Sequence, residues 1–256
     1  MNEHARAISE RGYTVLPRTH DDATVAAMRA RLTAIHEAHG APPPYASAAR
    51  ALGENAMLNP TGFVIFELLG IAPELAPRLL SPSLLAVARA VLGEDCSLEL
   101  TGAVISDAGR PFFSWHNHIG GIDVEAQRAS GVFPRFARSE RLIAVVYLDD
   151  VDADGGPLLA LPRRITDPTE PPFDLRAPDW DGQVELTFPR GSTLVFEQCT
   201  WHAVRPQRRE GLRMFVGSYL TSRAAPPTRA RDRSLVGFRG GGPLLRSVLR
   251  EPGPGA

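Results

Sequence analysis

Apolar residues recur at helical spacing in three segments of the first hundred residues. The stretch ARAISERGYTVL predicts a short helix that ends at Gly12 and runs into a strand. A second helix is expected within THDDATVAAMRARLTAIHEAHG, where Asp21 and Asp22 lie near the start and Gly40 ends it. The stretch SPSLLAVARAVLGED predicts a third helix with a serine cap and a glycine stop. The second helix is amphipathic, so we expect it to pack on a sheet.

Between the second and third helices the pattern loses its period. The segment APPPYASAARALGENAMLNPTG is rich in Pro and Ala and shows neither helical nor strand spacing. We therefore predict a loop or a lid there. Residues 1–95 as a whole are expected to form a helical N-terminal part.

From residue 97 the pattern changes to short apolar runs that are rich in β-branched residues. The runs are SLELTGAVIS, RLIAVVYL, GPLLALP, QVELTFP, STLVFEQ and RMFVGSYL, and turn clusters such as DADGG and PRG separate them. Such spacing is typical of an antiparallel sandwich or jelly roll. We predict one domain over residues 1–256, mainly β with flanking helices, whose jelly-roll core (a cupin-like double-stranded β-helix) covers about residues 97–223. An Arg-, Pro- and Gly-rich tail over residues 224–256 carries one short helix, GPLLRSVLR.

Composition and charge narrow the class of protein. With 43% hydrophobic and 22% charged residues, the 256-residue chain can bury a sizeable core. The formal net charge of -1 provides no overall field for nucleic acid or an anionic membrane surface, so we expect a small-molecule partner and neither of these. Cys96 and Cys199 form no CxxC pair and are expected to be buried thiols. No leader or membrane-span pattern is present, and we predict a cytoplasmic protein. The oligomeric state is not readable.

Candidate chemistry is concentrated in two stretches of the β half. In PFFSWHNHIGGIDVE, residues 111 to 125, His116 and His118 occupy alternate positions and Asp123 follows a Gly-Gly pair. In TWHAVRPQRREGLRMFVGSYL, His202 follows one predicted strand and Arg213 opens the next. A jelly roll brings distant residues together at one mouth, where two His can take adjacent positions around a divalent iron. A deeper arginine suits a carboxylate.

Three motifs resemble the phytanoyl-CoA dioxygenase-like family of iron(II) and 2-oxoglutarate oxygenases over nearly the whole chain. The opening ISERGYTVLPRTHDDATVAAMRARL is similar to the family's helix, strand and helix entry. YLDDVDADGGPLLALPRRI looks like its strand ending in Leu-Asp, an acidic turn and Gly-Pro-Leu. FPRGSTLVFEQCTWHAVRPQRREGLR is similar to its Gly-led strand, its distal histidine and the arginine eleven residues later. The order of the three motifs makes the resemblance fairly specific.

One position departs from the family pattern, which has a histidine, any residue and then an acid, often after Trp-His. WHNH matches the Trp and the first His, but His118 stands where the acid is expected. Three interpretations remain open. His118 can be the third ligand of a three-His iron, because alternate residues on a strand point to one face. Asp123 can supply the carboxylate if Gly120 and Gly121 let the chain turn back. The position can also stay open for a halide, as in the halogenating relatives. Strand alternation favours the first.

The resemblance implies roles for the remaining residues and for the cofactors. Fe(II) is held by His116 and His202 with the third ligand, and Arg213 holds the distal carboxylate of 2-oxoglutarate. Asp123, if it is not a ligand, is expected to orient His118 from outside the metal shell. Trp115 and Trp201 each precede a metal histidine and are expected to wall the substrate pocket. Dioxygen and a small molecule are the expected substrates.

The reaction expected from the resemblance is hydroxylation, desaturation or ring closure. Arg-, Ala- and Pro-rich usage favours a tailoring step in secondary metabolism, such as antibiotic biosynthesis. Three alternative functions remain open: a three-His dioxygenase that does not use 2-oxoglutarate, a related halogenase, and a jelly-roll binding protein without catalysis. Arg213 argues against the first of these, since such an enzyme needs no carboxylate anchor.

Overall fold

Two antiparallel sheets face each other in the computed structural model, which describes residues 2–119, 130–228 and 232–249. The larger sheet has the strand order β1-β10-β7-β12-β5-β4-β3-β2 and the smaller sheet the order β6-β11-β8-β9. The strands of the larger sheet are β1 (Tyr13–Leu16), β2 (Arg50–Ala51), β3 (Ala56–Asn59), β4 (Gly62–Phe66), β5 (Ser97–Ser106), β7 (Arg141–Tyr147), β10 (Thr193–Glu197) and β12 (Arg213–Thr221). Those of the smaller sheet are β6 (Phe113–His116), β8 (Leu158–Ala160), β9 (Val184–Leu186) and β11 (His202–Val204). Strands that are consecutive in the sequence alternate between the sheets from β5 to β8, so the predicted jelly roll is confirmed.

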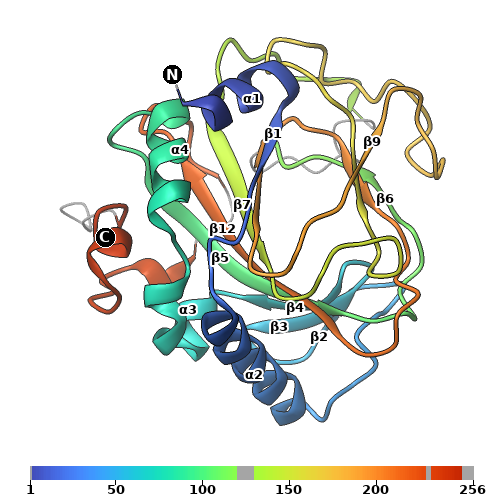
Figure 1. Ribbon diagram of the computed structural model, residues 1–256, viewed down its shortest axis with the longest axis vertical. Helices are drawn as coiled ribbons and strands as arrows, with labels where there is room; N and C mark the ends of the chain where they lie inside the picture. Colours follow the sequence, from blue (N-terminus) through green and yellow to red (C-terminus); the bar gives the residue numbers. More distant parts are fainter. Residues whose placement is uncertain (1, 120–129, 229–231, 250–256) are drawn as a thin grey trace.

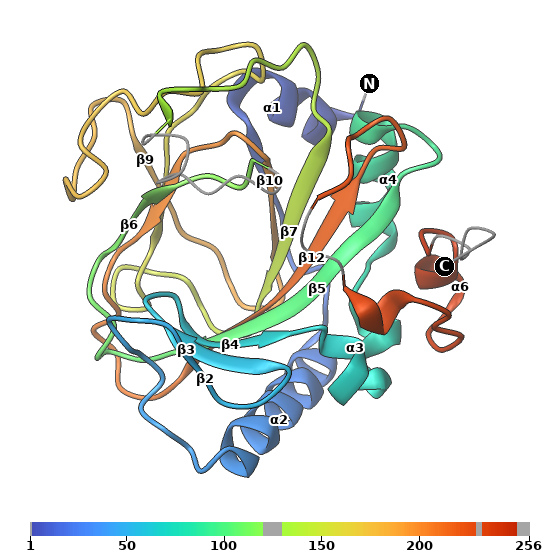
Figure 2. The same cartoon turned by 180° about the vertical axis from the view of Figure 1, so that it is seen from behind.

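Helices cover the outer face of the larger sheet. They are α1 (Glu3–Arg11), α2 (Asp22–Ala38), α3 (Leu68–Ile71), the 3-10 turn η1 (Pro73–Arg78), α4 (Pro82–Leu92), the 3-10 turn η2 (Arg233–Leu235) and α6 (Pro243–Arg246). Figure 2 shows α3 and α4 beside β5, β7 and β12, on the side away from β6 and β9. None of the helices in the described ranges is long and apolar enough to cross a bilayer.

The helix boundaries follow the capping signals in the sequence. Gly12 ends α1 with a left-handed φ of 82°. The Asp21 side chain accepts a hydrogen bond from the Thr24 N–H at 2.7 Å, and the Ser81 hydroxyl accepts one from the Leu84 N–H at 3.2 Å. Each cap satisfies an N–H group that the first helical turn leaves free. The three predicted helices are therefore confirmed, and the short helix predicted in the tail is present at Pro243–Arg246.

The interpretation of residues 41–62 as a loop or lid is wrong in its second half. β2, β3 and β4 form a meander there, and β4 pairs with β5 from Phe63 opposite Ile105 to Phe66 opposite Gly102. The meander therefore extends the larger sheet. Its strands are short and Ala- and Asn-containing, so their local pattern is weak, and pairing with a long neighbouring strand stabilises them.

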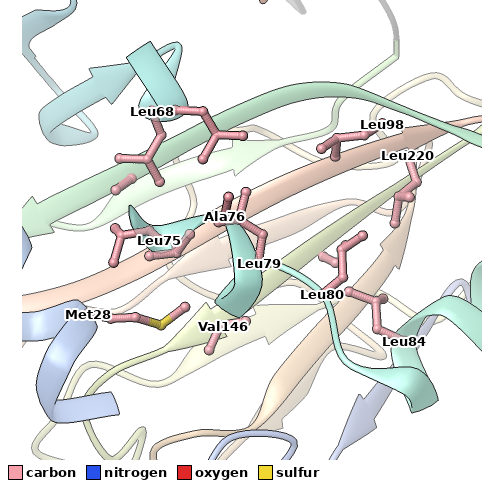
Figure 3. Packing of buried hydrophobic residues seen from close by; sticks show 14 of the residues in the cluster. Met28, Leu68, Leu75, Ala76, Leu79, Leu80, Leu84, Leu98, Val146 and Leu220 are labelled. Atoms are coloured by element: carbon pink, nitrogen blue, oxygen red, sulfur yellow. The ribbon is translucent and has the colours of Figure 1, made fainter. Parts of the chain in front are cut away.

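β7 separates the two main apolar clusters, because successive side chains point to opposite faces of a strand. Leu142, Ala144 and Val146 face the helices, whereas Ile143 and Val145 face the smaller sheet. Figure 3 shows Leu75, Leu79 and Leu84 of the helical layer packed over strand residues that include Val146, Leu98 and Leu220. The helical layer therefore covers the outer face of the larger sheet. The inner face is left to form a site between the two sheets.

Candidate metal centre

His116 and His202 lie directly opposite each other in the smaller sheet. β6 pairs antiparallel with β11, and His116 is the register partner of His202. Their ring centroids are 4.1 Å apart. His116 is the last residue of β6 and His202 is the first of β11, so antiparallel pairing alone brings these distant residues to the same end of the sheet.

His118 completes the cluster from just beyond β6. Its ring centroid lies 5.3 Å from that of His116 and 5.0 Å from that of His202. One ring nitrogen from each histidine can be chosen so that the three atoms lie within 4.8 Å of one another. The His118 N–H donates to the carbonyl oxygen of Gln198 at 2.9 Å, which continues the extended path of the chain. His116 and His118 therefore reach the same side, as strand alternation predicts.

Hydrogen bonds to the backbone determine which ring nitrogen of His116 and of His202 is free to bind a metal. Nδ1 of His116 lies 2.9 Å from the carbonyl oxygen of Ser114, and Nδ1 of His202 lies 3.0 Å from that of Thr200. A carbonyl oxygen only accepts, so Nδ1 carries the hydrogen in both rings. Nε2 is then left with a free lone pair, which is the arrangement that metal-binding histidines usually adopt.

All three imidazoles are held neutral. Burial lowers the pKa of His116 to about 4, and the positive charge of Arg110 adds to the lowering. Burial also lowers the pKa of His118 to about 3, with a further contribution from His116. The pKa of His202 lies well below its usual value, for the same reason of burial. Neutral imidazole is the form that binds a metal, so no proton has to be displaced at neutral pH.

A cavity of about 240 Å³ opens in front of the three histidines, between the two sheets. Its walls are mainly apolar and come from both sheets, including Val145 and Phe215 on one side and Phe113 and Leu158 on the other. A second cavity of about 390 Å³ shares several of these wall residues and extends toward Thr101 and Asp232. A metal in the histidine cluster would therefore face a mostly apolar space.

Arg213 is a buried cation near this cavity. It lies on the same face of β12 as Phe215 and Tyr219, which line the cavity, because all three are separated by even steps along the strand. Its guanidinium carbon stands 5.0 Å from the centre of the Tyr147 ring, and only 2% of the residue is exposed. No Arg213 side-chain nitrogen has a hydrogen-bond partner among the described residues.

These observations fit both groups that the resemblance implies. Three neutral nitrogen donors suit a divalent iron. A buried guanidinium without a hydrogen-bonded partner suits the carboxylate of 2-oxoglutarate, since an unsatisfied buried charge is costly. Asp123 lies outside the described residues, so its role as ligand or as a partner of His118 stays a prediction.

The two predicted pocket tryptophans lie elsewhere. Trp115 and Trp201 pack with Trp180, Leu159 and Leu175 in a separate cluster, and neither lines the cavity of the histidines. The Trp115 and Trp180 rings stack with centroids 4.2 Å apart. A residue next to a ligand on a strand points to the opposite face, so the expectation that these two residues wall the pocket is wrong.

Sequence reasoning missed Arg110, which does line the cavity. It lies in the turn between β5 and β6, within the stretch SDAGRPFF. A lone arginine in a turn beside Gly and Pro is ordinarily exposed, yet Arg110 is only 2% exposed. No local signal distinguishes it from the other arginines of the chain.

Comparison with known proteins is decisive at the level of family. The model of the family described as phytanoyl-CoA dioxygenase (PhyH) matches residues 8–215. The chain belongs to this family. PhyH proteins are non-haem iron oxygenases that use 2-oxoglutarate, so the cofactors expected from the resemblance are supported as well. No curated protein sequence matches the chain.

Solved structures share the PhyH fold at low sequence identity. HygX from Streptomyces hygroscopicus, with nickel, 2-oxoglutarate and hygromycin B bound, is 16% identical with a TM-score of 0.63, over 94% of this chain and 95% of HygX. The non-haem alpha-ketoglutarate-dependent carbocyclase SnoK from nogalamycin biosynthesis is 18% identical with a TM-score of 0.62, over 87% and 84% of the two chains. The corresponding epimerase SnoN is 16% identical with a TM-score of 0.58, over 86% and 82%. At these identities the likeness concerns the fold.

Proposed function

We propose that this PhyH protein is an oxygenase whose iron is held by His116, His118 and His202. The observation that carries the proposal is the cluster of three imidazoles, whose ligand nitrogens lie within 4.8 Å of one another and which line a cavity between the two sheets. When bound, Fe(II) and 2-oxoglutarate supply the oxidation of a substrate by dioxygen, with succinate and CO2 formed from the 2-oxoglutarate.

The protein's own groups would orient these partners. The carbonyl oxygens of Ser114 and Thr200 hold the rings of His116 and His202, so that Nε2 of each faces the metal. Arg213 would pair with the distal carboxylate of 2-oxoglutarate. The apolar walls exclude water from the place where the substrate is oxidised.

The substrate is proposed to be a small molecule from secondary metabolism. The cavity of about 390 Å³ beside the metal cavity has a mainly apolar lining that includes Val64 and Val104, with polar groups of Thr101 and Asp232 at one end. It has the size and character of a small-molecule site. HygX has been solved with hygromycin B bound, and SnoK and SnoN are from nogalamycin biosynthesis. These relatives support a tailoring step in antibiotic biosynthesis for this protein.

The test is an anaerobic titration of the metal-free protein with Fe(II) and then 2-oxoglutarate, followed by the visible charge-transfer band of the chelate. Wild type is compared with His118→Ala, His118→Asp and Asp123→Ala. We expect the band in wild type and in His118→Asp, since a carboxylate can replace an imidazole ligand. We expect His118→Ala to lose more Fe(II) affinity than the roughly 10- to 100-fold that loss of an outer partner costs.

Two outcomes would change the assignment. A larger loss in Asp123→Ala than in His118→Ala would make Asp123 the third ligand. A wild-type protein that binds Fe(II) but gives no band on addition of 2-oxoglutarate would contradict the proposed cofactor pair, and oxygen consumption without succinate would then indicate a three-His dioxygenase.

A further inference from the structure

Arg110 places a second buried positive charge in the cavity of the three histidines. Its Nη1 donates to the carbonyl oxygen of Thr61 at 3.4 Å, a long hydrogen bond. Nε and Nη2 are buried and have no hydrogen-bond partner in the ranges that the structure describes. The wall beside it is apolar, and its guanidinium carbon lies 5.9 Å from the centre of the Phe113 ring. A buried guanidinium that lines a cavity and has two nitrogens without a hydrogen-bond partner is suited to an oxyanion.

The charge on Arg110 is poorly compensated. Burial lowers the pKa of Arg110 to about 9 and the positive charge of Arg213 lowers it further, whereas Tyr147 and Asp107 oppose the lowering without cancelling it. At neutral pH the Arg110 guanidinium therefore remains protonated. Arg110 therefore places a positive charge in the wall of this cavity, and a bound divalent metal would add two more positive charges. The described part of the site therefore favours a dianionic ligand.

The position of Arg110 matches one end of such a ligand. Arg213 pairs with Ser106 at the end of β5, and Arg110 follows in the turn after that strand. Both arginines therefore lie near the same end of β5. The Phe113 ring is close to both Arg110 and the histidine cluster, since its centroid lies 5.9 Å from the Arg110 guanidinium carbon and 4.5 Å from the His116 ring centroid. A ligand in this cavity can therefore contact the metal site and Arg110 at the same time.

We propose that Arg110 binds the distal carboxylate of 2-oxoglutarate together with Arg213. The inference rests on the proposed function, because it takes 2-oxoglutarate to be the ligand of this cavity. Arg110 lines the cavity itself, so it can meet the carboxylate directly from the cavity wall, whereas Arg213 lies over the ring of Tyr147, which is another lining residue.

The experiment separates the distal carboxylate from the rest of the ligand. Dissociation constants of 2-oxoglutarate and of 2-oxovalerate, which carries a methyl group in place of the distal carboxylate, are measured on the Fe(II)-loaded protein under anaerobic conditions from the charge-transfer band. We expect Arg110→Met to weaken 2-oxoglutarate about 10- to 100-fold, the usual range for a hydrogen-bonded charge pair, and to leave 2-oxovalerate unchanged. Arg213→Met should show the same selectivity, and Arg110→Lys should recover part of the loss.

Thermal unfolding separates a binding role from a structural one. Because Arg110 is a buried charge with few partners, Arg110→Met is expected to keep or raise the melting temperature of the metal-free protein. The matched control is Arg141→Met. Arg141 is buried but bonded to both carboxylate oxygens of Glu99, at 2.9 and 3.2 Å, so its loss should lower the melting temperature and leave the preference for 2-oxoglutarate over 2-oxovalerate intact.

A failure of the proposed role of Arg110 and a failure of the proposed function give different results in these experiments. An unchanged preference in Arg110→Met, or an equal weakening of both ligands, would overturn the role at the distal carboxylate. Absence of the band with either ligand in wild type would instead contradict the proposed function and leave Arg110 without this ligand.

Discussion

Glu197 is a buried carboxyl at the end of β10, five residues before the metal-cluster residue His202. Its Oε2 accepts a hydrogen bond from the Cys199 N–H at 2.9 Å, and its Oε1 has no hydrogen-bond partner within the described part of the chain. Burial raises the pKa of Glu197 to about 7, although the Cys199 N–H and the charge of Arg163 oppose the rise. The carboxyl therefore titrates near physiological pH.

The sign of the resulting pH dependence follows from proton binding. Between the ordinary glutamate pKa of 4.5 and about 7, the folded state keeps a proton that the unfolded state has released. The contribution of Glu197 to the free energy of unfolding therefore decreases as pH rises through this window and is constant above it. Glu197→Gln should gain roughly 2–3 kcal/mol relative to wild type between pH 5 and pH 8.

Urea unfolding of the metal-free proteins at several pH values measures this difference. Groups that behave alike in both proteins cancel in the comparison. Glu10→Gln, a change at an exposed position, is the control and should show no such trend. A difference that stays constant from pH 5 to pH 8 would show that Glu197 is ionised throughout.

At the scale of elements, the junction of α1 and β1 supports the segment that carries His202. The Thr200 hydroxyl donates to the Gly12 carbonyl oxygen at 2.8 Å, and the Thr200 carbonyl oxygen in turn accepts from Nδ1 of His202. Gly12 has a φ of 82°, and a Cβ placed on it would lie 2.3 Å from the Thr200 hydroxyl oxygen. A side chain at position 12 would therefore both strain the backbone and displace the support of the histidine.

Gly12→Ala is predicted to destabilise the protein by about 2–4 kcal/mol, from left-handed strain and the steric clash together. Gly40→Ala is the matched control. Gly40 has the same φ of 82°, but a Cβ placed on it would meet no atom within 4 Å, so only the strain of about 1–2 kcal/mol applies. Urea unfolding checks the pair, and Fe(II) affinity should fall only in Gly12→Ala. Equal losses of stability in Gly12→Ala and Gly40→Ala would mean that Thr200 moves away from the new methyl group without a measurable loss of free energy.

At the scale of the whole molecule, a metal ion would join two parts of the chain that the sequence separates widely. His116 and His118 follow β5, whereas His202 comes after most of the remaining strands. A ligand that binds only the folded state stabilises it by about 2.7 kcal/mol at a hundred times its dissociation constant. The histidine cluster therefore predicts a measurable thermal response to metal.

Ni²⁺ is a suitable probe, because it binds the same donor types without oxygen chemistry. At a hundred times its dissociation constant it should raise the melting temperature by roughly 5–11 °C for a chain of this size. His116→Ala should remove the response, whereas His4→Ala, on α1, should retain it. A response that survives in His116→Ala would place the metal elsewhere.

The sequence by itself determined the elements whose signals are local. Asp21, Ser81 and Gly12 cap helices through hydrogen bonds and backbone conformations within a few residues, and β5 matches its apolar run residue for residue. The motif around His202 likewise indicated the family, together with the opening segment and the acidic turn, because each of these patterns is contained in a short stretch of sequence.

Tertiary structure decided which side chains share the cavity. Arg110 enters it only because the turn after β5 packs against Thr61 of the β3–β4 hairpin, and Trp115 leaves it because its neighbour His116 takes the inner face of β6. β2, β3 and β4 likewise depend on pairing that begins at β5. Contacts of this kind join residues that are far apart in the chain. The residues that stabilise each contact therefore do not occur together in any short stretch of sequence, and a local pattern cannot predict it.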